Sequence, residues 1–514
     1  MHTSRAETVE RMRSCPVDLL VIGGGITGAR IALEAARLGQ RVALIEGGDF
    51  GGGTSSASSK LVHGGFRYLA MGDIGLVRES QQERCALMES IAPNLVRPIP
   101  FLLPVYEGSP RGAATVATGL LLYRALAGHG GRAAIVNQRS ARDVVPSLRT
   151  AGLRMCGMFE EAETIDSRLV LATVKGAAKF GALVLNHARV IGLELRHNRG
   201  GIVTLKAEPE GLVEVRARCV INAAGPWVDH LRRLDDPTAA PLVRLSKGVH
   251  VLVPLEGNWK GGVAMPLQGG RVTLGIPWQG MLMLGTTDTL FTGNPSEVRV
   301  TIDDVRTILD EASGFLPPEM LAPQRVRFSM AGLRALPIAD GDTAAARREH
   351  LIEVSRNGLL SVAGGKLTTH RLIARDALRR LAGLHTLSPD SGRLPGTGWS
   401  LDVEACTALA PDIADHVERL YGDEAGQVLK LAAAVPDGLE RIDPSGPDIW
   451  AQVDYAFESE WAATAEDVGR RRTTLAVRGL MTEEIADRIR ARAANTPAPS
   501  GLKLIHVSEP TPTA

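Results

Sequence analysis

A glycine-rich turn between an apolar run and a helical pattern constrains the fold of this chain more than any other feature. Residues 18–22 read DLLVI, a short β-branched strand pattern, and the turn GGGITG follows at 23–28. Residues 28–39 then carry Ala and Leu at helical spacing, and RVALIE at 41–46 has the composition of a second buried strand. The order strand, turn, helix, strand predicts a β-α-β unit and therefore a parallel sheet.

The pattern G-x-G-x-x-G in this position is typical of dinucleotide-binding folds. Gly23 permits the turn, Gly25 lets a diphosphate approach the N-terminus of the helix, and Gly28 permits close packing of the helix on the strand. Glu46 ends the second strand, where its carboxylate can accept hydrogen bonds from the ribose of an adenosine and would repel a 2′-phosphate. FAD and NAD share these features, so the turn predicts a dinucleotide and leaves the choice between them open.

The composition bounds the size and the partners of the protein. The chain has 514 residues, of which 44% are hydrophobic, so we expect about two to four domains. Lys and Arg together number 58 against 57 for Asp and Glu, which gives no global field that would favour nucleic acid. The five cysteines are scattered singly, without the paired spacing of a zinc site or a disulfide framework. We therefore expect no metal site, and a reducing, cytoplasmic compartment.

The amino end and one apolar segment bear on membrane contact. Residues 1–16 contain no apolar h-region, so we expect a short frayed leader and no signal peptide. The apolar stretches fall short of the roughly 18 uninterrupted residues that a membrane-spanning helix needs. Residues 112–128 come nearest, and Arg124 interrupts them. Two interpretations stay open: a packed helix or hairpin of the second domain, or an interfacial segment that lies on a membrane.

A longer block of sequence points to a family. Residues 54–69 read TSSASSKLVHGGFRYL, and this block resembles the FAD-dependent glycerol-3-phosphate dehydrogenases, a branch of the D-amino-acid-oxidase-like flavoproteins. The resemblance continues at INAAGPWVD, LGTTD, AGLRALP and SVAGGKLTTHR. It covers about residues 18–375 and extends more weakly into the helical C-terminus through EWAATAEDVGRRRT. It implies FAD as the cofactor.

The predicted fold class is α/β, with a Rossmann-type FAD-binding domain, a mixed or antiparallel β substrate domain and a C-terminal all-helical cap. The FAD-binding domain is discontinuous, because CVINAAG at 219–225 is a nearly unbroken apolar run, typical of a central strand that returns to the first sheet. The predicted bounds are 17–66, 150–235 and 346–386 for the FAD-binding domain, 67–149 and 236–345 for the substrate domain, 400–496 for the helical cap and 497–514 for a flexible tail. We also expect Asp166 and Thr482 to cap helices.

The resemblance implies three further groups of FAD contacts. Small and hydroxylic residues after Glu46 would meet the diphosphate or the ribityl chain, a strand end without bulky side chains would allow close approach, and a glycine-rich helix start would line the isoalloxazine ring. These candidates are Thr54, Ser55, Ser56, Ser58, Lys60, Ala224, Gly225, Gly364, Gly365, Lys366, Leu367 and Thr368.

A glycerol phosphate substrate would need cations for its phosphate. The resemblance makes Arg67, Arg334 and Arg348 candidate ligands of the phosphate or of the hydroxyls, with Tyr68 in the same pocket and Lys366 beside the flavin. Each arginine could instead lie on the surface, and Tyr68 could be a core aromatic residue.

The reaction would also need a base for the C2 hydroxyl proton. His63 and His250 are the candidate bases, because an imidazole with a pKa near neutrality accepts a proton at little cost, and either could instead be a structural histidine. With Arg334 and Lys366 they form the predicted catalytic set.

The predicted function is oxidation of sn-glycerol 3-phosphate to dihydroxyacetone phosphate by hydride transfer to flavin N5. The resemblance alone implies that the electrons pass to a quinone; it also allows peripheral contact with the cytoplasmic face of the inner membrane and a homodimer. Three alternatives stay open: another polyol phosphate or an amino acid as substrate, O2 as acceptor, or a flavin-binding protein that serves mainly to bind a partner.

Overall fold

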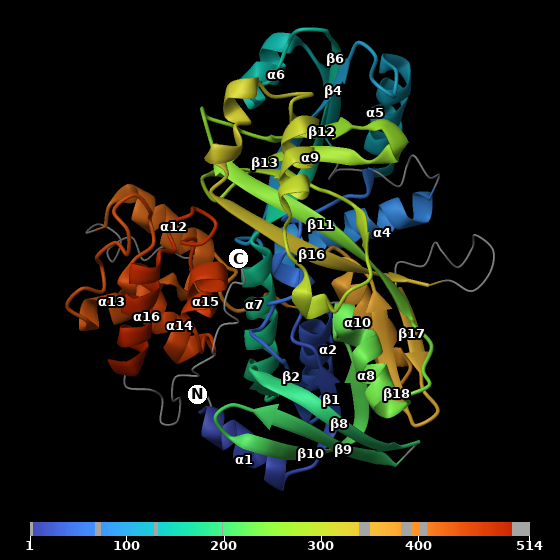
Figure 1. Cartoon of the computed structure of the whole chain (residues 1–514), viewed down its shortest axis with the longest axis vertical. Helices are drawn as coiled ribbons and strands as arrows, with labels where there is room; N and C mark the ends of the chain where they lie inside the picture. The colour runs from blue at the N-terminus through green and yellow to red at the C-terminus, as the bar shows by residue number, and fades with distance from the viewer. Residues whose placement is uncertain are drawn as a thin grey trace.

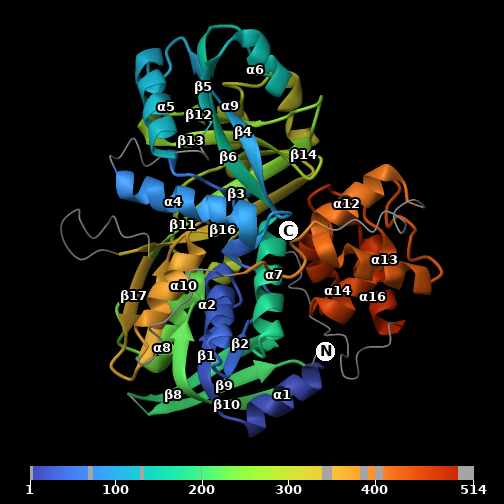
Figure 2. The ribbon, with the colours of Figure 1, turned by 180° about the vertical axis from the view of Figure 1, so that it is seen from behind.

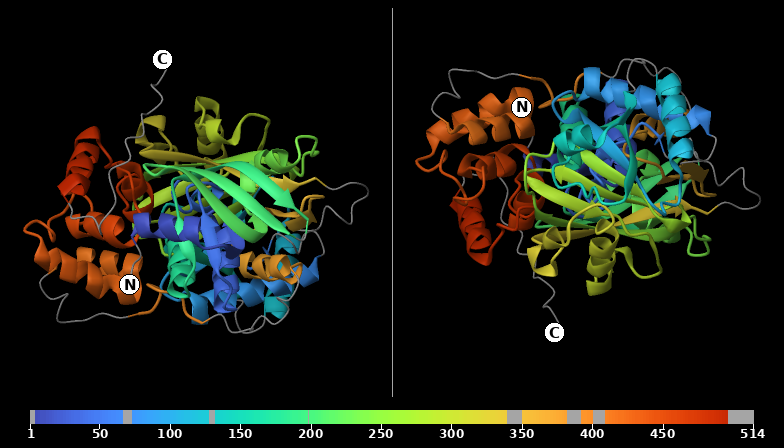
Figure 3. Two further views of the ribbon diagram at one scale, coloured as in Figure 1. Left: turned by 90° about the horizontal axis from the view of Figure 1, so that it is seen from below. Right: turned by 90° about the horizontal axis from the view of Figure 1, so that it is seen from above.

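The computed structural model describes residues 4–66, 73–127, 132–197, 199–338, 350–381, 392–399 and 409–495 of the chain. Two β-sheets lie one above the other along the long axis of the molecule, and a helical domain lies beside them (Figure 1; Figure 2). Seen from below and from above, the helical domain covers one side of the sheets only (Figure 3). The predicted fold class is confirmed.

The lower sheet is built around the predicted β-α-β unit. Its strand order is β17-β18-β10-β1-β2-β7, and β1 pairs in parallel with both β2 and β10. The segment CVINAAG, predicted to form a central strand of this sheet, belongs to β10 and its end. The bounds are β1 Val17–Ile22, β2 Val42–Ile45, β7 Leu183–Leu185, β10 Gly211–Asn222, β17 His350–Val354 and β18 Leu359–Gly364.

The alternation of side chains along β1 explains the two layers that cover this sheet. Leu19 and Val21 face a core that includes the helices α2 (Ile26–Arg37), α7 (Asp166–Lys179) and α10 (His370–Arg379). Leu20 and Ile22 face a second core, formed with the helix α1 (Arg5–Ser14) and the meander of β8 (Ala188–Arg196), β9 (Gly200–Ala207) and β10. A strand that is buried on both faces reads as the continuous apolar run seen in the sequence.

The helix α1, Arg5–Ser14, corrects the expectation of a frayed leader. Val9 and Met12 are buried against the lower sheet, three residues apart on one face of the helix. The Arg5 guanidinium donates to the backbone oxygens of Asn186 at 2.8 Å and Glu208 at 2.9 Å. Two apolar side chains and one arginine therefore hold this N-terminal segment against the lower sheet, although its composition predicted a frayed leader.

The upper sheet runs in the order β15-β11-β14-β13-β12-β4-β6-β3, with β16 on β11 and β5 on β6. Most of its pairs are antiparallel, as expected for the substrate domain. The bounds are β3 Leu61–Val62, β4 Val96–Tyr106, β5 Ala133–Val136, β6 Leu153–Thr164, β11 Val243–Pro254, β12 Gly262–Pro266, β13 Val272–Trp278, β14 Met281–Gly285, β15 Thr289–Phe291 and β16 Phe328–Pro337. The strands β3 and β6 belong to this sheet, although the predicted bounds place their residues in the FAD-binding domain.

Helices flank the upper sheet on both sides. They are α4 Ile74–Ala86, α5 Ala113–Ala127, α6 Gln138–Val144 and α9 Ile302–Ala312. The apolar segment at 112–128 forms α5, which packs Leu120 and Tyr123 into a core while Leu121 is 69% and Leu122 43% exposed. Helices in the described part of the chain are too short or too polar to cross a bilayer.

The C-terminal cap is helical, as predicted. Its helices are α12 Pro411–Tyr421, α13 Ala425–Ala434, α14 Trp450–Ser459, α15 Ala465–Asp467 and α16 Glu483–Asn495. Thr482 caps α16, since its hydroxyl accepts a hydrogen bond from the Ile485 N–H at 3.3 Å. The cap shares a core with the upper sheet, where Val417 and Leu420 pack with Phe101. The predicted tail at 497–514 lies outside the described residues.

Candidate functional site

The glycine turn packs so tightly that its first and last glycines have no room for a side chain. Gly23 has a φ of +111°, and a Cβ there would lie 2.5 Å from the Ala223 oxygen. A Cβ on Gly28 would lie 1.9 Å from the Gly23 oxygen. The turn, the start of α2 and the end of β10 therefore form one compact corner at the carboxyl edge of the lower sheet, the edge at which parallel α/β sheets bind ligands.

Gly25 is the N-cap of α2 and, without a side chain, leaves the N–H groups of the first helical turn to other partners. One of them, the Ile26 N–H, donates to Ser55 Oγ at 3.0 Å. A Cβ on Gly25 would lie 3.1 Å from the same hydroxyl oxygen. Ser55 thus lies over the positive end of α2, where a diphosphate would bind, and the residues present fit the diphosphate of FAD.

Glu46 is tied to the turn by two hydrogen bonds. Its Oε2 accepts from the Gly24 N–H at 2.7 Å, and its Oε1 accepts from the Gly48 N–H at 2.8 Å. Burial raises the pKa of Glu46, and the two N–H groups act in the opposite direction. The carboxylate lies beside the glycine turn, as the dinucleotide pattern requires.

The hydroxylic loop after Gly53 lies between the two sheets. Thr54 Oγ1 donates to the Leu333 oxygen of β16 at 2.6 Å, and Ser58 Oγ donates to Asp166 Oδ2 at 2.7 Å. A Cβ on Gly332 would lie 2.6 Å from the Ala57 oxygen, so the loop packs directly on β16. The loop therefore joins the lower sheet to the wall formed by β11 and β16.

Lys60 lies beneath this loop. Its Nζ is 2.8 Å from Asp166 Oδ1 and donates to the Ser56 oxygen at 2.6 Å, and the residue is 3% exposed. The Asp166 carboxylate therefore balances the positive charge that the sequence assigned to the FAD diphosphate. Asp166 is the first residue of α7 rather than its N-cap, and its carboxylate binds Lys60 and Ser58.

Two glycine-bearing segments complete the lower side of the site. Asn222 of β10 pairs with Ser361 of β18, which brings the ends of the two strands together. Gly225 has a φ of +54°, and Gly364 and Gly365 have φ values of +76° and +94°, so both strands end in turns that favour glycine. A Cβ on Gly365 would lie 2.3 Å from Ile373 Cδ1 of α10.

The start of α10 contacts the segment that carries His63. The His63 N–H donates to Thr368 Oγ1 at 3.2 Å, and the Leu367 oxygen lies 2.7 Å from His370 Nδ1. Thr368 is 1% exposed, while Lys366, two residues earlier, is partly exposed. The structure therefore brings the His63 backbone and the Gly364–Thr368 turn together, as the resemblance implies.

Arg334 lies on the face of the β11–β16 pair. Its Nη2 donates to Thr286 Oγ1 at 3.1 Å, its Nη1 is 3.6 Å from Asp288 Oδ1, and its side chain is 35% exposed. A Cβ on Gly248 would lie 2.5 Å from Arg334 Nη2, so the guanidinium lies across a strand position that has no side chain. Both partners belong to the segment LGTTD at 284–288.

His250 is buried in β11, and its Nε2 lies 3.0 Å from Ser59 Oγ. Burial lowers the pKa of His250 to about 3, and the charges of Lys60 and Arg334 act in the same direction. His250 is therefore neutral at pH 7 and a weak proton acceptor, whereas the pKa expected for the base was near neutrality.

The remaining substrate candidates, Arg67, Tyr68 and Arg348, lie outside the described residues. One residue that the sequence did not single out is Glu161 of β6. Its carboxylate accepts a hydrogen bond from the Gly64 N–H, directly after His63, and it is 5% exposed. Burial raises the pKa of Glu161 to about 7. A lone acid in a strand gives no sequence signal, because its importance comes from a loop 97 residues away.

Comparisons with known proteins agree with this arrangement. The family described as FAD dependent oxidoreductase matches residues 18–371, and the family described as C-terminal domain of alpha-glycerophosphate oxidase matches residues 376–496. The glycerol-3-phosphate dehydrogenase of Synechocystis is 34% identical over 90% of this chain and 89% of its own length. The chain belongs to the FAD-dependent glycerol-3-phosphate dehydrogenase family.

Other members of the dehydrogenase family are similarly close. The aerobic glycerol-3-phosphate dehydrogenase of Staphylococcus saprophyticus is 32% identical over 92% of this chain and 89% of its own length. The solved glycerol-3-phosphate dehydrogenase of Bacillus halodurans, complexed with FAD, superimposes with a TM-score of 0.76 at 30% identity, covering 96% of this chain and 94% of that one. The glycine oxidase of Geobacillus kaustophilus, at 21% identity and a TM-score of 0.55, shares the fold. FAD, predicted from the sequence, is confirmed as the cofactor of this family.

Proposed function

We propose that this chain is an FAD-dependent dehydrogenase that oxidises sn-glycerol 3-phosphate to dihydroxyacetone phosphate and passes the electrons to a quinone. One observation carries the proposal: a corner suited to FAD, with Arg334 on the adjoining wall, lies in a chain that matches the oxidoreductase family at 18–371 and the C-terminal domain of alpha-glycerophosphate oxidase at 376–496. The family match extends across the substrate wall, and it therefore supports the substrate as well as the cofactor.

The chain's own residues account for cofactor binding. The N–H groups at the start of α2 would bind the diphosphate, Glu46 would bind the ribose of the adenosine, and the turn at Gly364–Thr368 would lie at the flavin ring. When bound, FAD supplies the hydride acceptor at its N5 atom. A Cβ at Gly23, Gly28 or Gly365 would meet other atoms of the protein, so these glycines let the segments around the cofactor site pack closely on one another.

Substrate binding and proton removal would fall to residues on both sides of the site. Arg334, a planar cation held by Thr286 and Asp288, would bind the phosphate dianion, and Lys366 would contact the substrate beside the flavin. His63 would take the proton of the C2 hydroxyl as the hydride leaves C2. His250, neutral and buried, would hold Ser59 in the wall rather than accept the proton.

An exposed face at one end of the molecule would let the protein meet a membrane that contains the quinone. Leu121 and Leu122 of α5 and Ile135 of β5 are exposed, and α5 lies at the end of the upper sheet (Figure 1). Residues 111–142 contain five arginines and neither Asp nor Glu. An apolar helix face flanked by arginines suits an anionic lipid surface, in which a quinone dissolves.

Anaerobic reduction of the bound flavin tests the reaction. We expect sn-glycerol 3-phosphate to bleach the absorbance at about 450 nm, while amino acids and other polyol phosphates leave it unchanged. Bleaching by an amino acid but not by glycerol phosphate would overturn the proposed substrate, and flavin that stays oxidised with every donor would favour a binding protein. Reoxidation by a soluble quinone that is faster than reoxidation by O2 would support the acceptor.

Vesicle binding tests the lipid surface. Wild type should sediment with vesicles that contain an anionic lipid and remain free with neutral ones, and the double substitution Leu121→Gln, Leu122→Gln should abolish sedimentation. Leu212→Gln, at an exposed position of β10 in the lower sheet, serves as the control and should bind as wild type does. Equal sedimentation of all three proteins would contradict the assignment of α5.

A further inference from the structure

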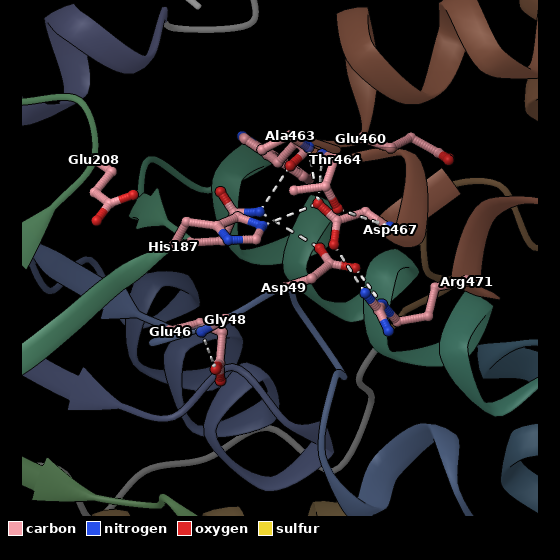
Figure 4. Close-up of polar contacts among 12 residues, drawn as sticks. Glu46, Gly48, Asp49, His187, Glu208, Glu460, Ala463, Thr464, Asp467 and Arg471 are labelled. Carbon is pink, nitrogen blue, oxygen red and sulfur yellow. Dashed lines mark hydrogen bonds and ion pairs between the residues drawn. The ribbon is translucent and has the colours of Figure 1, made fainter. Parts of the chain in front are cut away.

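One of the contacts between the helical cap and the FAD-binding domain is made by the buried carboxylate of Asp49 (Figure 4). Asp49 follows β2 and is 3% exposed. Its Oδ2 lies 2.5 Å from Arg472 Nη1 and its Oδ1 lies 2.7 Å from Arg472 Nη2, while Arg471 Nε donates to Oδ2. Two consecutive arginines of the cap thus bind one aspartate of the lower sheet, across 423 residues of sequence.

A second carboxylate extends this contact. Asp467 Oδ1 accepts from Arg471 Nη2 at 2.8 Å, and Asp467 Oδ2 lies 2.9 Å from His187 Nε2 (Figure 4). The ligand atoms of Asp49, His187 and Asp467 lie within 4.8 Å of one another, as they would around a metal ion. Here Arg471 and Arg472 already supply the positive charge that the two carboxylates require. The cluster of Asp49, His187, Asp467, Arg471 and Arg472 is therefore a network of ion pairs between the two domains, which we call the ionic joint.

The joint includes an apolar contact that reaches the glycine turn. Phe50 is fully buried, and its ring lies edge-on to Trp461 of the cap, with ring centroids 5.7 Å apart. Phe50 also packs against the glycine turn, since a Cβ on Gly24 would lie only 2.5 Å from Phe50 Cδ1. The Gly51 N–H donates to the Gly24 oxygen at 3.0 Å. Trp461 thus supports Phe50, and Phe50 supports the turn that faces the diphosphate.

The joint also reaches the acid that faces the ribose. Gly48 precedes Asp49, and its N–H donates to Glu46 Oε1 at 2.8 Å. The Gly48 oxygen accepts from the His187 N–H at 2.8 Å, and the Glu46 oxygen accepts from the Ala188 N–H at 2.9 Å. Residues 46–52 are therefore held from one side by β8 and from the other by the cap, and their position fixes both Glu46 and the turn.

We propose that Asp49, Arg471, Arg472 and Trp461 are positioning residues through which the helical cap holds the adenosine-binding loop at 46–52 in its FAD-binding conformation. Cofactor affinity then depends on docking of the cap, and by thermodynamic reciprocity bound FAD strengthens that docking. This inference rests on the proposed binding of FAD. In this proposal the cap acts on the adenosine end of the cofactor and not on the flavin ring that reacts.

Titration of FAD into the deflavinated full-length chain tests the proposal. Asp49→Asn keeps the shape of the side chain and removes its charge. We expect it to raise the Kd for FAD about 5- to 150-fold, the usual range of coupling between sites. ADP carries the adenosine and diphosphate half alone, so its Kd should rise by the same factor. With FAD saturating, kcat and KM for glycerol 3-phosphate should equal those of wild type.

A matched control separates this effect from a general loosening of the cap. Lys175 of α7 binds Glu424 at 2.6 Å and Glu460 at 2.8 Å, so it joins the same two domains without touching residues 46–52. Lys175→Met should lower the thermal midpoint and leave the Kd for FAD within about twofold of wild type. If Asp49→Asn does not fold, Trp461→Leu takes its place, with the same expected rise in the Kd.

The outcomes separate this proposal from the proposed function. Wild-type protein that binds no FAD would refute the proposed function itself. Wild type that binds FAD, together with a folded Asp49→Asn or Trp461→Leu variant of unchanged FAD and ADP affinity, would refute the positioning role alone. An equal loss of FAD affinity in Lys175→Met would also refute it, since docking in general and not the loop would then be responsible.

Discussion

Glu46 Oε2 and the Gly24 N–H are joined by a hydrogen bond of 2.7 Å, so the acid that would bind the ribose also fixes the turn that would bind the diphosphate. The same carboxylate accepts the Gly48 N–H through its other oxygen. One side chain therefore links the two halves of the adenosine diphosphate site.

Replacing this carboxylate by an amide should weaken FAD binding. In Glu46→Gln one of the two acceptor oxygens becomes an NH2 group, which cannot accept from either N–H. The unsatisfied N–H should lower stability, and the ribose would lose a hydrogen bond to a charged group, worth about 1.5–3 kcal/mol, so we expect the Kd for FAD to rise roughly tenfold or more. Fluorescence titration with FAD measures it. Glu208→Gln changes an exposed acid and should bind FAD as wild type does.

Two glycines of the turn should respond differently to the same methyl group. A Cβ on Gly28 would meet the Gly23 oxygen at 1.9 Å, so Gly28→Ala should unfold the corner and lower the thermal midpoint. A Cβ on Gly25 would meet only the Ser55 hydroxyl, at 3.1 Å, and that hydroxyl can rotate. Gly25→Ala should therefore fold normally and lose FAD, because the methyl group occupies the approach of the diphosphate. Normal FAD content in purified Gly25→Ala would show that the diphosphate does not bind there.

The local features of this fold could be predicted because their signals are local. The glycine turn, Glu46 and the apolar strands require neighbours within a few residues, and β10 was predicted from a continuous apolar run in CVINAAG. The helix α1 was missed, since only its docking onto the lower sheet explains why Val9 and Met12 recur on one face.

The ion pairs of the site could not be predicted from spacing. Lys60 looked like a diphosphate ligand, and only the fold reveals Asp166, 106 residues away, as its partner. Likewise, the low pKa of His250 follows from burial between Lys60 and Arg334, which a single sequence does not display. The partners that balance these charges lie far away in the sequence, so a motif shows the charged residue and not its partner.

Arg334 should govern substrate affinity without affecting the cofactor. Arg334→Met removes the charged hydrogen bonds to the phosphate, each worth about 1.5–3 kcal/mol, so kcat/KM for glycerol 3-phosphate should fall about 10- to 100-fold, mainly through KM. FAD content should remain that of wild type. Arg244→Met, at an exposed position of β11, is the matched control and should have normal kinetics. Unchanged kinetics in Arg334→Met would place the phosphate elsewhere.

The pH dependence of kcat/KM should show which of the two candidate bases, His63 or His250, removes the proton. If His63 removes the hydroxyl proton, His63→Asn should lower kcat by about 10²- to 10⁴-fold and abolish the limb of the kcat/KM profile that reports its ionisation. His250 is already neutral above a pKa of about 3, so His250→Asn should keep that limb. Stopped-flow reduction of the flavin between pH 5 and 9 measures both variants. A profile that loses its limb in His250→Asn would reverse the assignment.

Glu161, buried next to His63, should make stability depend on pH. Burial raises its pKa from 4.5 to about 7, with the Arg84 charge and the Gly64 N–H acting in the opposite direction. Between these two values the folded protein holds a proton that the unfolded chain has released. Its contribution to stability is therefore fully present below pH 4.5 and is lost as the pH rises through about 7.

Glu161→Gln mimics the protonated acid and keeps an acceptor for the Gly64 N–H, so its stability should not change through this group. Between pH 5 and 9 the free energy of unfolding of wild type should fall relative to the variant by roughly 3 kcal/mol. Urea denaturation of both proteins across this range measures the difference, with Glu107→Gln as a control at an exposed acid. Parallel stability curves would mean that Arg84 holds the Glu161 carboxylate ionised throughout. In that case the loop of His63 would rest on a buried ion pair, and Arg84→Met would be the more damaging change.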